Sequence, residues 1–323
     1  MIRAGIFGIQ VHTGKFIDLL RKNGVEVCVC WNDEETKGRD LAREYSLTYE
    51  EDLLKAMDDY DIDTAIITVG TYLHEKVLLL AAQRDLNIFL EKPLCISMEE
   101  ADNILEALKA SKGKFYMSEP FVRSELIAMK HLIEEGKLGQ ITSAYFRIGR
   151  MKNWDHFDLR KQQGGTICDF GVHGLHMIQY LFGRPEKVIS AVEDLSGHKA
   201  EDNITAIFTY PSGLQVCYQS SYVSAGNTNR AAVYGTKGFC EAQANVDKAG
   251  LAEFRWTDGE EGIKDLKLPE APMEHIDYFV KMIKEDLPNE IVGQDEASLL
   301  GVNAKDAYGL TEMIHMIYEG DKL

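Results

Sequence analysis

The chain has 323 residues, more than one ordinary α/β domain holds and enough for two domains with cores of their own. Hydrophobic residues make up 45% of it and charged residues 27%, proportions typical of a soluble globular protein. The formal net charge of −17, without a visible stripe of lysine and arginine, disfavours a nucleic-acid partner. The chain has no long apolar span and no signal-like start, so we expect no membrane contact and a cytoplasmic location.

The cysteines are spread along the chain, and none forms a Cys-x-x-Cys pair. Cys28 and Cys30 fall on one face of a predicted strand. Small buried side chains in a reducing compartment explain this pattern better than disulfides or metal ligands. The six cysteines are Cys28, Cys30, Cys95, Cys168, Cys217 and Cys240.

The first third of the chain alternates between short apolar runs and stretches with helical periodicity. This alternation predicts right-handed βαβ units and a parallel sheet that is buried on both faces. We therefore expect a doubly wound Rossmann domain over residues 1–120. The predicted strands are 2–7, 25–31, 64–69, 86–90 and 115–118, and the helices include 37–45, 98–108, one carrying Phe16, Leu19 and Leu20, and one carrying residues 77–82.

Beyond residue 123 the pattern changes. A helix over 125–134 precedes a half-exposed strand over 141–150, and strand-like runs separated by turn signals fill 187–255. Their spacing predicts an antiparallel sheet of five or six strands. The tail from residue 272 is helical again, with a break near Pro288. We expect a second α+β domain over 121–323, built on an open, mostly antiparallel sheet, with the late helices packing back on the first domain.

The first strand ends in a glycine turn that suits a dinucleotide. Gly8 lies where the chain turns sharply, and the amides at the start of the next helix would face a pyrophosphate. The fingerprint is incomplete, because Gln10 occupies the second glycine position and Gly14 comes one residue late for the third. An ordinary strand–helix turn is the competing interpretation.

The second predicted strand ends at the position that meets a cofactor ribose. Asn32 takes the place usually held by an acid, and Asp33 follows it. With Glu34 and Glu35, Asp33 makes this corner negative, and no arginine comes directly after. We therefore expect NAD(H) in preference to NADP(H). A solvated helix start explains Glu34 and Glu35 equally well.

The run Glu91-Lys92-Pro93 directly follows the predicted strand 86–90. Lys92 therefore lies at the carboxyl edge of the sheet, where a nicotinamide would sit. A partly desolvated lysine there can polarise a carbonyl group or share the proton of a substrate hydroxyl. Pro93 is a candidate for a cis peptide bond. The competing interpretation is a surface lysine that opens a loop.

A second motif runs from Gly164 to His176. On a helix, Asp169 and His173 are four residues apart and lie on one face. A carboxylate beside an imidazole fixes its tautomer and stabilises its charged form, as a general acid or base requires. The pair Gly164-Gly165 would let the backbone approach a ligand closely. A surface Asp–His pair is the alternative.

With these motifs the chain resembles the Gfo/Idh/MocA oxidoreductase family along nearly its whole length. The resemblance implies that Lys92, Asp169 and His173 form the catalytic set. It also implies a Rossmann domain followed by an α/β domain whose open sheet serves oligomerisation, and hence a homodimer or homotetramer through the C-terminal sheet. The matching segments are the turn at Gly8, residues 69–74, residues 91–93, the glycine pair with Asp169-x-Gly171-x-His173, and residues 295–297 before 303–307.

Cofactor and substrate contacts follow from the same match. Two departures affect them: Gly70 stands where the family commonly has proline, and His176 where members often carry an acid. The expected cofactor contacts are Gly8, Ile9, Gln10, Asn32, Asp33, Gly70, Thr71, His74, Glu91 and Lys92. The expected substrate contacts are Arg123, Trp154, His156 and His176, with Arg160 as a further candidate.

The sequence thus predicts hydride transfer between a nicotinamide and a secondary alcohol or ketone of a sugar, polyol or related compound. Either His173 or Lys92 carries the hydroxyl proton, and both assignments stay open. Three other functions are consistent with the motifs: an NAD-dependent lyase or glycosidase with tightly bound cofactor, a non-catalytic nucleotide sensor, and a metal hydrolase using His173, His176, Asp169 and His156. Because the resemblance explains these four residues without a metal, we expect no metal site.

Overall fold

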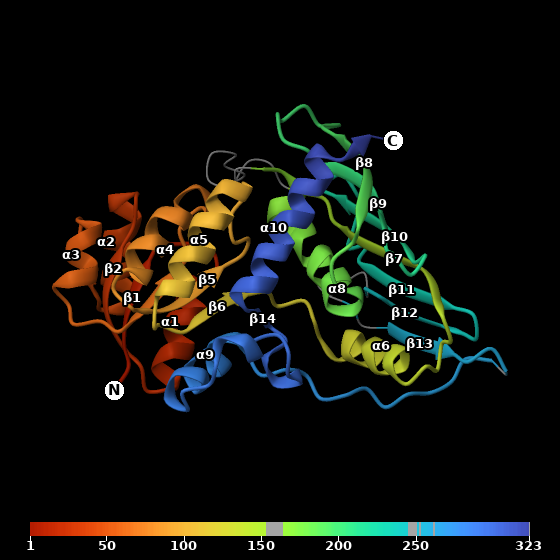
Figure 1. Ribbon diagram of the computed structural model, residues 1–323. Helices are drawn as coiled ribbons and strands as arrows, with labels where there is room; N and C mark the ends of the chain where they lie inside the picture. The colour runs from red at the N-terminus through yellow and green to blue at the C-terminus, as the bar shows by residue number, and fades with distance from the viewer. Residues whose placement is uncertain (153–163, 245–250, 252, 261, 323) are drawn as a thin grey trace. The chain divides into compact units, whose positions relative to one another are not determined.

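The computed structural model, shown in Figure 1, describes residues 1–152, 164–244, 251, 253–260 and 262–322. Contacts within the chain divide it into two compact units. The first unit is Met1–Glu119 with Met273–Thr311, and the second is Pro120–Pro272 with Glu312–Leu323. Within the described part, none of the helices is long and apolar enough to cross a membrane.

The first unit is built on a seven-stranded sheet in the order β14-β6-β5-β4-β1-β2-β3. Strands β1 to β6 are parallel and β14 is antiparallel to β6, which confirms the predicted doubly wound sheet. The two-residue strand β3 was not predicted, because so short a run has no periodicity. The strands are β1 Arg3–Phe7, β2 Glu26–Trp31, β3 Thr48–Tyr49, β4 Thr64–Ile67, β5 Asn87–Glu91, β6 Phe115–Ser118 and β14 Gly301–Val302.

Helices follow the parallel strands, as the alternating periodicity predicts. Helix α1 buries Phe16, Ile17 and Leu20 in a cluster that also contains Ile276 and Phe279 of α9. The late helix α9 therefore belongs to the core of the first unit. The helices are α1 Thr13–Lys22, α2 Glu35–Tyr45, α3 Leu53–Asp58, α4 His74–Ala82, α5 Met98–Ala110, α9 His275–Lys284 and α10 Ala304–Glu319, whose last residues lie in the second unit.

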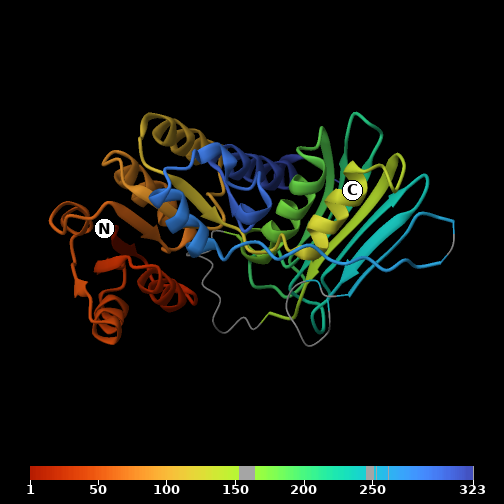
Figure 2. The same ribbon diagram turned by 90° about the horizontal axis from the view of Figure 1, so that it is seen from below.

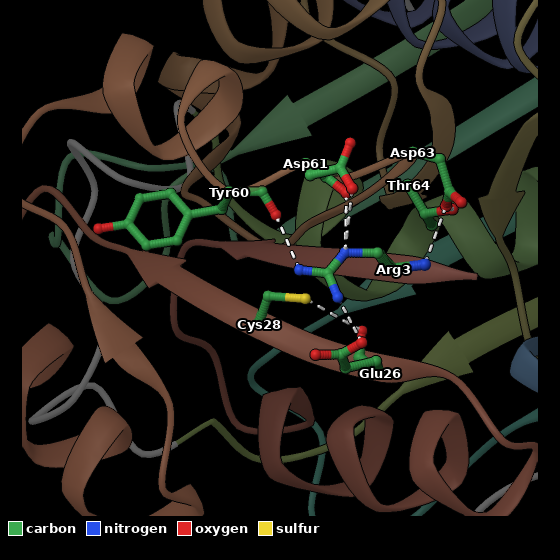
Figure 3. A network of polar contacts seen from close by, with 7 residues as sticks. All are labelled: Arg3, Glu26, Cys28, Tyr60, Asp61, Asp63 and Thr64. Atoms are coloured by element: carbon green, nitrogen blue, oxygen red, sulfur yellow. Dashed lines mark hydrogen bonds and ion pairs between the residues drawn. The ribbon is translucent and has the colours of Figure 1, made fainter. Parts of the chain in front are cut away.

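Arg3 joins the amino ends of three strands at the edge of the sheet opposite to the glycine turn (Figure 3). Its Nε donates to the carbonyl of Asp61 at 2.9 Å, and its guanidinium pairs with Glu26 at the start of β2. Its backbone N–H donates to the Asp63 carboxylate, next to β4, at 3.1 Å. These contacts tie the amino ends of the strands together; in doubly wound sheets, ligands bind at the opposite, carboxyl edge.

The second unit is built on an eight-stranded sheet in the order β13-β12-β11-β7-β10-β9-β8-β15. Two strand pairs, β7 with β10 and β8 with β15, are parallel and the others antiparallel, as predicted for the C-terminal domain. The strands are β7 Ile141–Gly149, β8 Lys187–Glu193, β9 Asn203–Thr209, β10 Gln215–Ser221, β11 Arg230–Gly235, β12 Phe239–Gln243, β13 Glu253–Thr257 and β15 Asp321–Lys322.

Helices α6, Ser124–Glu134, and α8, Val172–Phe182, lie on the same face of this sheet, as Figure 2 shows. Strand β7 alternates accordingly: Phe146 and Ile148 are buried, whereas Tyr145 and Arg147 point to the other face. Tyr145 donates to Gln219 Oε1 at 2.8 Å, and Arg147 donates to the same atom at 2.7 Å. No described helix covers this second face, so the sheet is open, as expected.

All six cysteines are free thiols. Burial raises the pKa of Cys30 to about 11 and that of Cys240 to about 12, so these thiols stay protonated and unreactive at neutral pH. The expectation of small buried side chains holds for Cys30, Cys95, Cys168 and Cys240, whereas Cys28 and Cys217 are partly exposed.

Candidate active site

Gly8 shapes the turn between β1 and α1. Its φ is +101°, and a Cβ atom there would lie 2.1 Å from the backbone nitrogen of Val69, so only glycine fits. Its N–H donates to the carbonyl of Trp31 at 2.9 Å, which ties the turn to the end of β2. The turn after β1 is thus held in its conformation even though Gln10 occupies the second glycine position of the fingerprint.

The first turn of α1 follows the Gly8 turn, at the carboxyl edge of the sheet. Thr13 accepts a hydrogen bond from the Gln10 N–H at 2.8 Å and contacts Thr68 at 3.2 Å, while Thr68 donates to the Gly8 carbonyl at 2.7 Å. The first turn of α1 contains no acidic residue, and no side chain caps it. Its amide dipoles therefore remain available to an anion, and the residues present fit a cofactor diphosphate.

At the end of β2, Asn32 and Asp33 differ in their environment. Asn32 is 5% exposed and its amide donates to the Glu34 carbonyl at 3.0 Å. The Asp33 carboxylate accepts a hydrogen bond from the hydroxyl of Tyr72, which follows β4. Glu34 and Glu35 pair with Lys37 and Arg39 along α2. The described ion pairs therefore neutralise Glu34 and Glu35, whereas none of them includes Asp33.

His74 links the loops that follow β4 and β5. One ring nitrogen lies 2.8 Å from the Pro93 carbonyl, and the other lies 3.2 Å from the Val69 carbonyl. Burial lowers the pKa of His74, against the raising effect of these carbonyls, so the ring is neutral. His74, expected as a cofactor contact, therefore positions the loop that carries Lys92. Gly70 and Thr71 lie in the same loop and are buried.

Glu91 ends β5, and Lys92 follows it with a cis peptide bond to Pro93. Burial raises the pKa of Glu91 to about 7; Lys92 opposes the shift and Glu119 adds to it. Glu119 is fully buried and directly follows β6, the strand beside β5. Lys92 thus follows a partly buried carboxyl group, that of Glu91, at the carboxyl edge of the sheet that also carries Gly8.

The helical segment within the motif 164–176 begins with a π-helical turn. Residues Ile167–Gly171 form a π-helix, which continues as α8. Such turns are often found at functional sites. A Cβ on Gly165 would lie 1.8 Å from the carbonyl oxygen of Glu201. The interpretation of Gly165 as making room for a ligand was wrong, because this glycine makes room for the chain leading into β9.

Asp169 lies in a cluster of cations and aromatic rings. Its Oδ2 is 2.6 Å from Lys152 Nζ, accepts a hydrogen bond from the Tyr222 hydroxyl, and is 3.8 Å from the Arg150 guanidinium. Burial and the carboxylate raise the pKa of Tyr222 well above its usual value, so its hydroxyl stays a donor. Two cations and a hydroxyl donor therefore surround the Asp169 carboxylate, and none of these three groups was predicted from the sequence.

His173 is buried between two phenylalanines. Its ring stacks on Phe121 with centroids 3.9 Å apart, and Phe170 meets it edge-on at 5.8 Å. His176, one turn further along α8, is 4% exposed. Two buried histidines thus lie on the same helix, and the orientation of the His173 ring is fixed by aromatic packing.

The remaining expected substrate contacts lie on separate segments of the chain. Arg123 is exposed and stands at the start of α6. Trp154, His156 and Arg160 lie outside the described residues. In the described part of the chain, no group of three or more His, Cys, Asp or Glu side chains is arranged to hold a metal ion.

Comparison with known proteins identifies the family. Residues 2–119 match an oxidoreductase family with an NAD-binding Rossmann fold, and residues 126–241 match the GFO/IDH/MocA C-terminal domain. The chain belongs to the Gfo/Idh/MocA oxidoreductase family. It is therefore an NAD(P)-dependent oxidoreductase, as the resemblance predicted.

Several family relatives are recognisable in sequence. Trans-1,2-dihydrobenzene-1,2-diol dehydrogenase of Sus scrofa is 26% identical over 252 residues, which cover 74% of this chain and 73% of that protein. Myo-inositol 2-dehydrogenase of Thermotoga maritima is 25% identical over 269 residues, 77% of this chain and 78% of that one. The WlbA dehydrogenase from Bordetella pertussis, solved with NADH and UDP-GlcNAcA, shares the fold with a TM-score of 0.82 over 98% of this chain and 95% of that one, at 16% identity.

Several side chains of this Gfo/Idh/MocA member were not found from its sequence. Lys152, Tyr222 and Glu201 lie on three separate segments, so no local spacing connects them with Asp169. The sequence offers one indication of Lys152: it is a basic residue that comes shortly after the predicted strand 141–150. Such a signal is common at strand ends and has little discriminating power.

Proposed function

We propose that this oxidoreductase transfers a hydride reversibly between NAD(H) and a secondary alcohol or ketone of a sugar, polyol or related hydroxylated compound. The observation that carries the proposal is the position of Lys92, directly after β5, at the same sheet edge as the glycine turn at Gly8. Two relatives whose names describe oxidation of a cyclic diol and of an inositol support the substrate class.

We assign the proton chemistry to Lys92, Asp169 and His173. When bound, the nicotinamide supplies the carbon that accepts or returns the hydride. The His173 imidazole accepts the hydroxyl proton as the alcohol C–H bond breaks and its electron pair leaves with the hydrogen. Lys92 donates a hydrogen bond to the oxygen and stabilises its developing negative charge. The negative charge of the Asp169 carboxylate, four residues before His173, favours the protonated form of the His173 imidazole.

In the alternative assignment, Lys92 and His173 exchange roles at the same site. Lys92 can carry the proton itself, and His173 then only binds the oxygen. The pH dependence of kcat separates the two assignments. Loss of the acidic limb, the fall in kcat at low pH, in His173→Ala supports His173, and its persistence assigns the proton to Lys92.

We propose NAD(H) as the preferred cofactor, because the Asp33 carboxylate would repel a 2′-phosphate at the ribose. We further propose that residues 1–120 form the cofactor domain and residues 121–323 the substrate domain. Arg123 and His176 are the described candidates for substrate contacts.

We propose that the chain works in the cytoplasm as a homodimer or homotetramer joined through the open face of the eight-stranded sheet. That face carries Tyr145, Arg147 and Gln219, which satisfy one another's hydrogen bonds and present a pre-ordered polar and aromatic surface. Light scattering after size exclusion should give a multiple of 36.4 kDa, and Tyr145→Glu should shift it toward the monomer.

An absorbance screen at 340 nm with NAD⁺ and NADP⁺, over sugars, polyols and their glycosides, tests the proposed reaction. Substrate-dependent absorbance that is lost in Lys92→Met supports hydride transfer with net oxidation. Consumption of a glycoside without an absorbance change, by protein that co-purifies with NAD, would favour the lyase or glycosidase reaction instead. No conversion by any route, with cofactor bound, would favour the nucleotide sensor.

A further inference from the structure

A guanidinium beside Asp169 has no role in the mechanism above. Arg150 comes directly after β7, and its N–H donates to the Ser221 carbonyl at 3.0 Å, so its backbone is fixed against the end of β10. Its guanidinium lies over the Phe170 ring at 4.3 Å and over the Tyr222 ring at 5.6 Å. The two rings thus hold the guanidinium by cation–π contacts, while 44% of the side chain stays exposed.

Two of the described cations lie at different distances from the Asp169 carboxylate. Lys152 Nζ is 2.6 Å from the carboxylate, whereas Arg150 is 3.8 Å away, at the outer limit of an ion pair. Of these two, Lys152 therefore holds the carboxylate more closely, and Arg150 is bound to it only weakly. The Arg150 Nε is buried and has no hydrogen-bond partner among the described residues, although the side chain as a whole is 44% exposed.

We propose that Arg150 binds an anionic group of the substrate, a carboxylate or a phosphate, so that the preferred substrate is an acidic or phosphorylated sugar. The planar N–H fork of arginine matches both groups. Phe170 contacts both Arg150 and His173, which places the anion site one aromatic ring from the candidate base. This inference rests on the proposed function, because it assumes that the reacting hydroxyl lies at His173.

Matched substrates test the inference. Each hexose is compared with its hexuronate and its hexose 6-phosphate, with NAD⁺ held constant and absorbance followed at 340 nm. A charge-assisted pair makes kcat/KM for one anionic form exceed that of the neutral hexose about tenfold or more. The uronate and the 6-phosphate are separate arms, and the preferred arm identifies the anionic group.

Substitutions of Arg150 separate charge from packing. Arg150→Met keeps an unbranched side chain on Phe170 but removes the cation, and should reduce the ratio of anionic to neutral kcat/KM to about one, mainly through KM. Arg150→Lys should keep part of that ratio. Lys187→Gln, which removes an exposed positive charge from the same unit, should leave the ratio unchanged. Equal preference in the wild type, or an equal loss for both substrate forms in Arg150→Met, would overturn the inference.

Failure of the proposed function is distinguishable from failure of this inference. If no sugar is turned over, calorimetry with glucuronate and glucose 6-phosphate replaces the kinetics, on wild type and Arg150→Met in the presence of NAD⁺. Binding of one anion that the variant loses supports the anion site even without hydride transfer. Absence of binding to the wild type overturns it.

Discussion

Glu201 and Gly165 join the strand region of the second unit to the start of the helix that carries Asp169 and His173. The two oxygens of the Glu201 carboxylate accept the Gly165 N–H at 2.8 and 2.9 Å, and one of them also accepts the Ile167 N–H at 3.2 Å. Tyr318 of α10 donates a further hydrogen bond, and burial raises the pKa of the carboxyl group. A buried acceptor thus satisfies the first amides of the π-helix, which no helical carbonyl reaches.

Glu201→Gln should loosen this helix start. The new amide group presents N–H atoms where the native oxygen accepts backbone N–H groups, so about 1–3 kcal/mol of stability should be lost. We expect a lower Tm and a lower kcat, with NADH affinity unchanged because the proposed cofactor residues belong to the other unit. Glu193→Gln on the exposed end of β8 is the matched control. Wild-type Tm and kcat in Glu201→Gln would show that the contact is dispensable.

Lys152→Met should impair catalysis through Asp169. Removal of the cation 2.6 Å from a carboxylate that is 17% exposed leaves the more distant Arg150, at 3.8 Å, among the described cations, so the charge is less well compensated. We expect kcat/KM to fall about tenfold or more, with partial recovery in Lys152→Arg. In an Asp169→Asn background the same substitution should cost much less, because the charge that Lys152 balances is gone. Additive losses in this cycle would contradict the coupling.

Much of this molecule was predictable from the sequence. Strands β1, β2, β4, β5 and β6 were found because parallel strands buried on both faces form continuous apolar runs. The position of Lys92 at the end of β5 was predicted because it directly follows such a run in a distinctive tripeptide. Lys152 and Tyr222 were missed because their meeting at Asp169 depends on the pairing of β7 with β10, which sequence periodicity does not encode. Gly165 was misinterpreted for a related reason: its neighbour, Glu201, is distant in sequence.

The stability of the cofactor-free protein should depend on Glu91 between pH 4.5 and 7. The pKa of Glu91 rises from about 4.5 to about 7 on folding, so in this range the folded state binds more protons than the unfolded state. Its contribution to stability is present below pH 4.5 and is lost as the pH rises through 7. His74, whose pKa is lowered by burial, acts in the opposite direction near its usual pKa of 6.5.

Glu91→Gln isolates the first effect, because His74 is common to both proteins. Thermal unfolding from pH 5 to 7.5 should show Tm of the variant rising relative to wild type as the pH increases. Glu99→Gln, a first-turn residue of α5, provides a matched comparison without this trend. A difference in Tm that stays constant over the range would argue against a raised pKa at Glu91.

Cofactor choice should depend on Asp33. Its carboxylate, fixed by the Tyr72 hydroxyl, disfavours a 2′-phosphate, so NADH should quench protein fluorescence at about tenfold lower concentration than NADPH. Asp33→Asn should narrow this preference, mainly by improving NADPH binding. Glu35→Gln, whose native partner is Arg39, should leave it unchanged. Tighter binding of NADPH to the wild type would mean that the acidic corner points away from the ribose.

The central claim is that Lys92 takes part in hydride transfer, and the turnover of Lys92→Met tests it most directly. The substrate is one identified in the 340 nm screen, NADH affinity is measured in parallel, and Lys76→Met on the exposed side of α4 is the control. We predict that kcat falls about 10²- to 10⁴-fold while the Kd for NADH stays within about threefold. Turnover equal to that of the wild type would contradict the assignment of Lys92.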